Sequence, residues 1–404
     1  MHTADVAVVG AGPAGSAAAI TLARAGRQVT LLDKARFPRD KTCGDGLTTG
    51  ALRLLEGLGL DPAEVPSWQR VDDVVVRGPS GHEVTFPLPR DRGLYAAVAR
   101  RADLDAALVE LARAAGVKVL DGHGCTRAAE TTDAVVLTVE GIGEVTAPFA
   151  VAADGMWSPV RRHLGLATPA YRGEWHAFRQ YFTAVGPRAA RDLVVWFEPD
   201  LLPGYAWSFP LPDGHANVGF GIQRGGKVRR IQDMAAIWRD LVDRPHVREV
   251  LGAGARPESP HRAWPIPARI DEAVLTGART LFAGDAATAT DPLTGEGIGQ
   301  ALLTGVLAAE AIVAHGPSAA AVTAAYRDAA HEALVADHRM SSLLIRAVRH
   351  RKGVRAGLRL AGATGWTRRN FARWLFEDYP RGLLATPGRW HRGMLSGDGA
   401  YRPG

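Results

Sequence analysis

The pattern of apolar positions at the start of the chain predicts a β–α–β unit. Residues 5–10 and 28–33 are short apolar runs of the kind that form parallel strands buried on both faces. The stretch between them, 15–25, is rich in small residues that let a helix pack closely on a sheet. We therefore expect an α/β fold with a parallel sheet of the Rossmann type.

Later segments extend this sheet and add a second one. Leucine spacing predicts a helix over 96–115, the run 117–120 is interpreted as another short strand, and the run 280–283 as another buried strand. Two excursions contain alternating segments with proline and glycine between them, which indicates an inserted antiparallel sheet on the substrate side. The predicted parts are a discontinuous Rossmann-type domain (1–67, 98–167 and 265–315), a substrate-binding domain (68–97 and 168–264) and a C-terminal basic helical region (316–404).

Composition fits a globular protein of the cytoplasm. The chain has 404 residues, 47% of them hydrophobic, and its two cysteines allow one disulfide bond at most. The most apolar segment, 301–314, contains Glu310 and follows a glycine-rich turn, so we interpret it as a buried helix and predict no transmembrane span.

The net charge of +6 comes from the C-terminal part of the chain. Residues 339–392 contain 13 Lys and Arg residues and only two acidic residues. This composition has two interpretations: peripheral docking on the inner face of an anionic membrane, or solvated helices packed on the protein. We expect no nucleic-acid partner, since no recognised binding motif occurs. Apolar residues interleave with the basic ones at Leu343, Leu344, Ile345, Val348, Trp366, Phe371, Trp374 and Leu375.

A glycine-rich segment links the first predicted strand to the first helix and predicts a dinucleotide site. Gly10, Gly12 and Gly15 leave room for a pyrophosphate at the N-terminus of the helix. Asp33 ends the next strand, where its carboxylate can accept hydrogen bonds from ribose hydroxyls. This fingerprint serves both FAD and NAD.

A second motif favours FAD over NAD as the bound dinucleotide. The strand at 280–283 runs into Gly284 and Asp285, whose carboxylate can reach a ribityl chain. The glycine turn 291–298 then starts a helix whose positive end can stabilise charge on a reduced flavin. A third strand runs into Asp154 and Gly155, a turn that by itself has little specificity.

In order and spacing the three motifs resemble the large flavoprotein class of the aromatic hydroxylases, flavin halogenases and geranylgeranyl reductases, over most of 5–315. Residues 37–47 resemble a segment of the geranylgeranyl reductases, and 203–210 (Pro-Gly-Tyr-Ala-Trp-Ser-Phe-Pro) resembles the cavity-wall motif of those enzymes. The halogenase tryptophan motif is absent, and none of the lysines (34, 41, 118, 227 and 352) lies where a halogenase needs one. Hydroxylases usually carry an asparagine where this chain has 297–300 (Gly-Ile-Gly-Gln).

The resemblance implies a set of site residues and no metal site. Arg101 is implied to contact the FAD phosphate, although Arg100 beside it leaves that assignment open. Cys43, Tyr205 and Trp207 are candidate catalytic residues, and Tyr205, Trp207 and Phe209 are candidate substrate contacts. The expected FAD contacts are Gly10, Gly12, Pro13, Ala14, Gly15, Asp33, Lys34, Cys43, Gly44, Arg101, Cys125, Asp154, Gly284, Asp285, Pro292, Gly295, Glu296, Gly297 and Ile298.

The implied activity is reduction of C=C bonds in a polyprenyl chain, either a geranylgeranyl lipid or a prenylated quinone such as menaquinone. Hydride from the reduced flavin and a proton would reach the two alkene carbons. The alternatives are an NAD(P)H-dependent flavin monooxygenase acting on an aromatic or polyketide-type molecule, and a non-catalytic FAD-binding protein. The electron donor stays open between NADPH and a ferredoxin-type protein.

Overall fold

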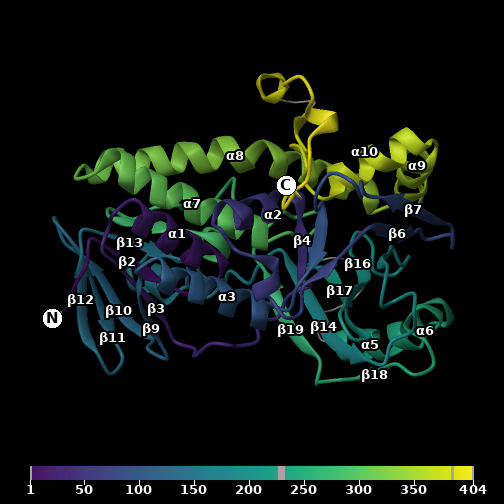
Figure 1. The fold of residues 1–404 in the computed structure, drawn as a ribbon, viewed down its shortest axis with the longest axis horizontal. Coiled ribbons are helices and arrows are strands. Elements are labelled where there is room, and N and C mark those ends of the chain that lie inside the picture. Colours follow the sequence, from purple (N-terminus) through teal and green to yellow (C-terminus); the bar gives the residue numbers. More distant parts are fainter. Residues whose placement is uncertain (1, 226–232, 384–385, 403–404) are drawn as a thin grey trace.

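The computed structural model describes residues 2–225, 233–383 and 386–402. Its first part is built on a five-stranded parallel sheet, on the left of Figure 1. The strands β2 and β13 are buried along their whole length, as the apolar runs predicted. The sheet order is β20 (Thr280–Phe282), β13 (Phe149–Ala152), β2 (Val6–Val9), β3 (Val29–Asp33) and β9 (Lys118–Asp121).

Helices cover this sheet, and two of them approach each other very closely. A Cβ at Gly305 of α7 would lie 2.1 Å from the Ala14 carbonyl oxygen of α1, so the contact requires glycine. Within the described residues α7 is the one helix long and apolar enough to cross a membrane, yet it packs against α1, α2 and α8 as a core helix does. The helices are α1 (Pro13–Arg24), α2 (Thr49–Gly57), α3 (Arg101–Ala114), α7 (Ile298–His315) and α8 (Ala319–Val348).

Two smaller sheets flank the parallel sheet. A four-stranded sheet was not predicted and contains β1 (His2–Thr3), β12 (Gly143–Ala147), β11 (Val135–Val139) and β10 (Cys125–Glu130). The other contains β4 (Gly46–Thr48), β8 (Ala96–Val98) and β5 (Gln69–Arg70). The helix predicted over 96–115 is therefore wrong at its start, because 96–98 pairs with β4 and β5 and the helix begins at Arg101.

The second part, on the right of Figure 1, is an eight-stranded sheet that is antiparallel except for the parallel pair β15 and β6. Helices α5 (Met234–Asp243) and α6 (Pro245–Leu251) cover one face around Trp196, Phe220 and Trp238. The strands are β6 (Asp73–Arg77), β7 (Glu83–Pro87), β14 (Trp175–Thr183), β15 (Leu193–Trp196), β16 (Tyr205–Leu211), β17 (His215–Gln223), β18 (Arg256–Pro257) and β19 (Arg262–Ile266). The predicted fold class is confirmed.

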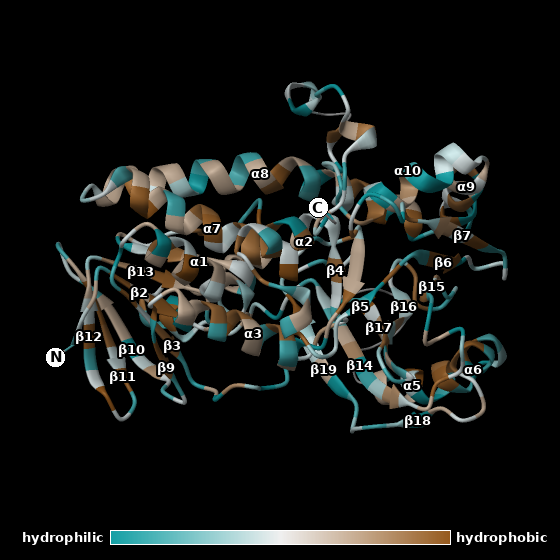
Figure 2. Ribbon diagram, viewed as in Figure 1, coloured by the Kyte–Doolittle hydropathy of each residue, from teal (hydrophilic) through white to brown (hydrophobic). Residues whose placement is uncertain are grey.

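The C-terminal region is helical only to Leu375, through α8, α9 (Arg351–Gly362) and α10 (Gly365–Leu375). Hydrophilic and hydrophobic residues alternate along α8, as expected of a helix with one face on the protein (Figure 2). In the described residues beyond α10, short 3-10 turns (Pro387–Arg389 and Met394–Ser396) interrupt irregular chain, and Ala400 bridges to Leu94.

Most of the apolar tail residues face the protein. The Phe371 ring lies 4.7 Å from the Phe86 ring of β7, and Ile345 packs with Trp175 and Ala268. Leu343 and Trp366 are exposed, with 56% and 60% of their surface accessible. The tail is therefore a layer packed on the protein, with a few apolar side chains left at the surface.

Candidate functional site

The glycine-rich loop between β2 and α1 forms a cradle for an anion. A Cβ at Gly10 would lie 2.3 Å from the Ala153 carbonyl oxygen, and one at Gly15 would lie 1.7 Å from the Gly10 oxygen, so both positions are closed to larger residues. At Gly12 the nearest atoms to such a Cβ are guanidinium nitrogens of Arg39 and Arg101, at 3.6 and 3.7 Å. The N-terminus of α1 and the guanidinium groups of Arg39 and Arg101 thus face the same open space beside Gly12.

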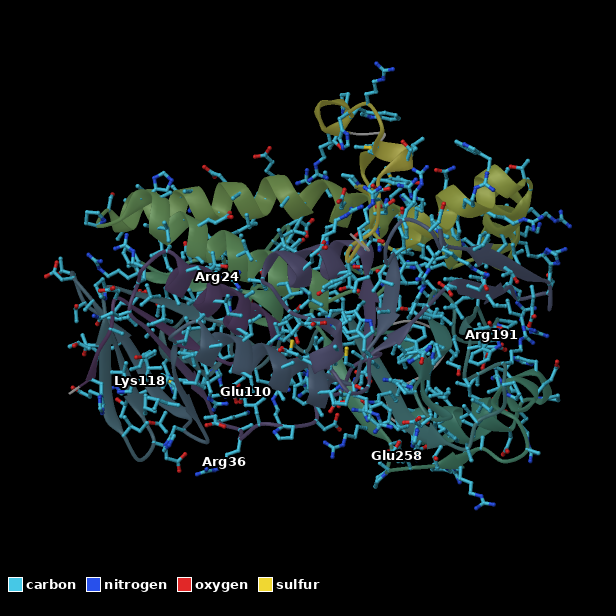
Figure 3. All side chains as sticks on the ribbon, viewed as in Figure 1. Arg24, Arg36, Glu110, Lys118, Arg191 and Glu258 are labelled. Carbon is cyan, nitrogen blue, oxygen red and sulfur yellow. The ribbon has the colours of Figure 1, made fainter. Side chains whose placement is uncertain are left out.

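Arg101, not Arg100, lies beside this loop. Its Nε and Nη2 donate to the two carboxylate oxygens of Asp105, at 2.8 Å each, and Arg39 donates to the same carboxylate at 2.7 Å. Arg100 instead makes a bidentate pair with Glu258, which is labelled in Figure 3, at 2.7 Å for both bonds. Asp105 therefore holds the Arg39 and Arg101 guanidiniums next to Gly12.

Asp33 and its neighbours form the far end of the cradle. The Asp33 carboxylate accepts from the amides of Ala11 at 2.7 Å and Ala35 at 2.8 Å, and so fixes the loop. Lys34 lies beside Gly124, the residue before Cys125. Burial and the nearby Asp154 carboxylate raise the pKa of the Cys125 thiol to about 11, so this thiol is neutral.

Asp154 itself is half-buried between β13 and α4 (Pro159–His163). Its Oδ2 accepts from the Val160 amide at 3.0 Å, whereas its Oδ1 has no hydrogen-bond partner among the described residues. Burial raises the pKa of this carboxyl. A buried oxygen without a partner is costly unless a bound group supplies a donor, so Asp154 fits a cofactor contact.

The Gly284–Asp285 turn after β20 is held from both sides. Arg161 donates to the carbonyl oxygens of Ala286 at 2.6 Å and Val274 at 2.8 Å, and the Gly284 amide donates to Thr304 of α7. Asp285 is half-buried, and among the described residues its carboxylate has only a long contact, 3.4 Å, with the Thr290 hydroxyl. Its carboxylate is therefore available to a ligand.

The loop 291–298 is held by its own carboxylates. Asp291 accepts from the amides of Leu293 and Thr294 and from the Ser341 hydroxyl of α8. Glu296 is buried and accepts from the Gly299 amide at 2.6 Å, at the N-terminus of α7. Burial together with the Glu377 charge raises the pKa of Glu296. Pro292 and Ile298 are buried, Gly297 precedes the first residue of α7, and Gly295 is exposed.

A row of aromatic side chains on β16 faces the segment 37–47. The ring of Trp207 lies 6.0 Å from those of Tyr205 and Phe209, on the face opposite to α5 and α6. Trp207 lies across Gly219, where a Cβ would come within 2.4 Å of the indole, and a Cβ at Gly44 would lie 3.4 Å from the Phe209 ring. The predicted aromatic wall and the Cys43–Gly44 segment are thus in contact.

The aromatic wall is also tied to the flavin motifs. The Tyr205 hydroxyl donates to the carbonyl oxygen of Thr294 in the loop 291–298. The Asn217 side chain accepts from the Trp207 indole at 3.1 Å and donates to the carbonyl oxygen of Cys43 at 2.8 Å. Burial raises the pKa of the Cys43 thiol, although Arg101 beside it acts in the opposite direction.

The sequence analysis did not predict several residues that lie in this region. Arg39 and Lys41 lie in the segment 37–47, whose resemblance to the geranylgeranyl reductases could have pointed to them. The Lys41 ammonium lies 3.7 Å over the Trp264 ring, and burial lowers its pKa to about 8 against the attraction of Asp285. Asn217 and Arg381 stand in no motif. Asn217 bonds to Cys43, 174 residues away, and Arg381 bonds to Asp291, 90 residues away.

Comparison with known proteins agrees with this geometry. The family described as FAD binding domain matches residues 3–331. Menaquinone reductase of Mycobacterium tuberculosis is 37% identical over 332 residues, 76% of each chain. Digeranylgeranylglycerophospholipid reductase 2 of Methanopyrus kandleri is 33% identical over 315 residues, again 76% of each chain.

Solved structures share the fold. A geranylgeranyl bacteriochlorophyll reductase-like protein of Thermoplasma acidophilum has a TM-score of 0.80 at 21% identity, covering 96% of this chain and all of its own. The p-nitrophenol 4-monooxygenase of Pseudomonas putida has a TM-score of 0.74 at 19% identity, covering 92% and 97%. The chain therefore belongs to the geranylgeranyl reductase family of FAD-dependent oxidoreductases, as its motifs predicted.

Proposed function

We propose that this protein saturates C=C bonds of a polyprenyl chain, either of a geranylgeranyl lipid or of a prenylated quinone such as menaquinone. The observation that carries the proposal is the contact between the β16 aromatic row and the segment 43–46. Relatives at 33–37% identity are reductases of menaquinone and of a digeranylgeranyl phospholipid, which supports the same substrate class.

FAD fits the cradle described above, and when reduced it supplies hydride. Gly12 and Arg101 would hold the pyrophosphate, Asp33 the ribose and Asp285 the ribityl chain. The free Asp154 oxygen and the open position at Gly12 support this arrangement.

The protein's own part is to bind an apolar chain and to exclude water. Tyr205, Trp207 and Phe209 offer a continuous aromatic surface, and apolar contact is the main source of affinity for a hydrocarbon. Exclusion of water prevents solvent from reacting with a substrate carbon on which positive charge develops. Cys43, a neutral thiol beside this wall, would position the alkene, and Cys43→Ala is expected to slow turnover; full turnover would remove this role.

The direct test is an anaerobic turnover. The FAD-loaded protein is reduced with dithionite, a polyprenyl quinone is added, and flavin reoxidation is followed by absorbance. A product with two added hydrogens in its side chain supports the reductase. An unchanged lipid, with reoxidation only after oxygen is admitted, would instead indicate a flavin monooxygenase acting on an aromatic or polyketide-type molecule. A flavin whose reoxidation no lipid or oxygen accelerates would point to a non-catalytic FAD-binding protein.

The same assay addresses the electron donor, for which we propose either NADPH or a ferredoxin-type protein. Stopped-flow mixing of the oxidised protein with each donor measures the rate at which the flavin absorbance bleaches. The donor that bleaches the flavin at least as fast as the steady-state turnover is the physiological class.

We propose a cytoplasmic protein that docks peripherally on the inner face of the membrane through α9 and the start of α10. Leu360 is 73% and Trp366 60% exposed. Basic side chains surround them at Arg351, Lys352, Arg355, Arg359, Arg368 and Arg369. Apolar side chains among cations suit an anionic lipid surface, with about 1 kcal/mol gained per basic residue near it.

Sedimentation with vesicles tests this docking. We expect binding to vesicles containing phosphatidylglycerol and weaker binding to phosphatidylcholine alone. Charge reversal at Arg355 and Arg359 should abolish the binding, whereas Lys118→Glu, at an exposed lysine of β9 at the opposite end of the molecule (labelled in Figure 3), should not. Equal binding of both variants would contradict the proposed surface.

A further inference from the structure

The two carboxylate oxygens of Asp45 differ in their contacts. One accepts two hydrogen bonds, and the other accepts none from the described residues. The residue lies two positions after Cys43, with φ of +66° and no exposed surface. Its Oδ2 accepts from the Tyr181 hydroxyl at 2.6 Å and from the Asn217 amide at 2.8 Å. Its Oδ1 is buried and has no partner in the described part of the chain.

This carboxyl lies among the groups already assigned to the substrate wall. Asn217 holds Asp45 with the same amide group that bonds to Cys43, and its carbonyl oxygen orients the Trp207 indole. A Cβ at Gly46, the next residue, would lie 3.2 Å from the Phe209 ring. The Asp45 carboxyl is therefore joined by hydrogen bonds to both sides of the proposed alkene site.

The surroundings of Asp45 favour a carboxyl that changes charge near neutral pH. Burial raises its pKa to about 6, although Tyr181, Arg179, Asn217 and Arg101 all act to lower it. The charged and titratable groups that face it are Arg179 and Tyr181 of β14, Arg101 and Arg100 at the start of α3, and Cys43. A raised pKa keeps part of the carboxyl protonated and able to donate, which general acid catalysis requires.

We propose that Asp45 is the acid that donates the proton to the alkene, held by Tyr181 and Asn217 as positioning residues. This inference rests on the proposed reductase function. The O–H bond of Asp45 breaks and a C–H bond forms at the carbon that does not receive hydride. The electron pair for saturation arrives with the hydride that reduced FAD supplies. The Asp45 carboxylate then regains a proton from solvent, so charge and atoms balance.

The first test compares Asp45→Asn with the wild-type holoenzyme. Asparagine keeps an oxygen that accepts from Tyr181 and Asn217 but cannot give up a proton. We expect this variant to retain FAD and to saturate the polyprenyl chain about 100-fold or more slowly. The wild-type rate should fall as pH rises above the Asp45 pKa, and the variant should lose this dependence. Asp192→Asn, which alters another buried carboxyl, should keep the wild-type rate and profile.

A second variant keeps the proposal falsifiable if Asp45→Asn does not fold. Tyr181→Phe removes a hydrogen bond that lowers the Asp45 pKa, so the pH at which the rate falls should rise by about one unit. Independently of turnover, infrared spectroscopy of the wild-type protein should show a carboxylic-acid C=O band that titrates and is absent in Asp45→Asn.

The outcomes separate the two ideas. A wild-type protein that leaves the polyprenyl chain unchanged overturns the proposed function, and the role of Asp45 with it. A wild-type protein that saturates the chain, with Asp45→Asn equally fast or Tyr181→Phe unshifted in its pH profile, overturns the role of Asp45 alone.

Discussion

Arg381 and Asp291 form a buried ion pair, with 2.7 Å between Nη1 and Oδ1 and side chains only 1% and 4% exposed. Asp291 belongs to the loop that precedes α7, and Arg381 lies in the irregular chain after α10. Arg381 also contacts Glu377, whose other neighbours are Gln300 and Thr48. The C-terminal segment is thus a structural part of the expected flavin site.

Removal of Arg381 should destabilise the protein strongly. Arg381→Met leaves the buried Asp291 carboxylate without its counterion and removes the ion pair of the half-buried Glu377, which costs about 3–5 kcal/mol of unfolding free energy. Urea unfolding of the FAD-free protein measures this loss. Arg402→Met, which breaks an exposed pair with Asp398, should cost about 0–1 kcal/mol. Equal losses in the two variants would show that burial of the Arg381 pair is unimportant.

Gly12→Ala should separate cofactor binding from folding. Apart from the adjoining residues of the loop, the nearest described atoms would lie 3.6 Å and 3.7 Å from the added methyl group, so we expect the free energy of unfolding to change by no more than about 1 kcal/mol. The methyl group would occupy the open position of the cradle, and FAD should be lost on gel filtration. Gly57→Ala, whose added methyl group would meet no atom of another described segment within 4 Å, should retain FAD. Retention of FAD by Gly12→Ala would place the pyrophosphate elsewhere.

Arg101 and Arg100 offer a matched pair of substitutions. Lysine at 101 keeps a positive charge but loses the planar guanidinium group that lies beside Gly12. We therefore expect FAD to bind about tenfold more weakly. Lysine at 100 alters the pair with Glu258 and the contact with the Tyr181 ring, neither of which involves Gly12, and should leave FAD affinity unchanged. Isothermal titration of each apo-variant with FAD measures the dissociation constants. A larger effect at Arg100 would reverse the assignment.

The buried acids around Arg381 should make stability depend on pH. Burial raises the pKa of both Glu296 and Glu377 above their usual range. Such groups favour the folded state while protonated, and this stability is lost as pH rises through the folded-state pKa. We therefore expect the unfolding temperature of apo-protein to fall between about pH 5 and about pH 9. The unfolding temperature of Glu377→Gln should fall less steeply with pH. A slope identical to that of the wild-type protein would contradict the raised pKa of Glu377.

The sequence predicted the parts of the fold that depend on local patterns. Gly10, Gly15 and Asp33 stand at fixed spacing because the turn, the helix and the next strand are consecutive, and the structure brings them together as expected. The buried strands were recognisable since apolar runs of this length suit a parallel sheet.

What could not be predicted depends on contacts between distant segments. Residues 96–98 look helical by their alanines, and only pairing with β4 and β5 makes them a strand. An amphipathic pattern likewise does not say what covers its apolar face, so Phe371 could not be assigned to Phe86 rather than to a membrane. The Arg381–Asp291 pair joins positions 90 residues apart and has no local signature.

The same ion pair has a consequence for biosynthesis. A ribosome completes the glycine-rich loop first and Asp291 much later, and Arg381 follows after a further 90 residues. Until that arginine emerges, the loop before α7 carries a carboxylate whose counterion has not been made. A chain that stops before Arg381 would therefore keep the glycine-rich cradle but leave the Asp291 carboxylate without its counterion, a destabilised state of the kind that cellular proteases remove.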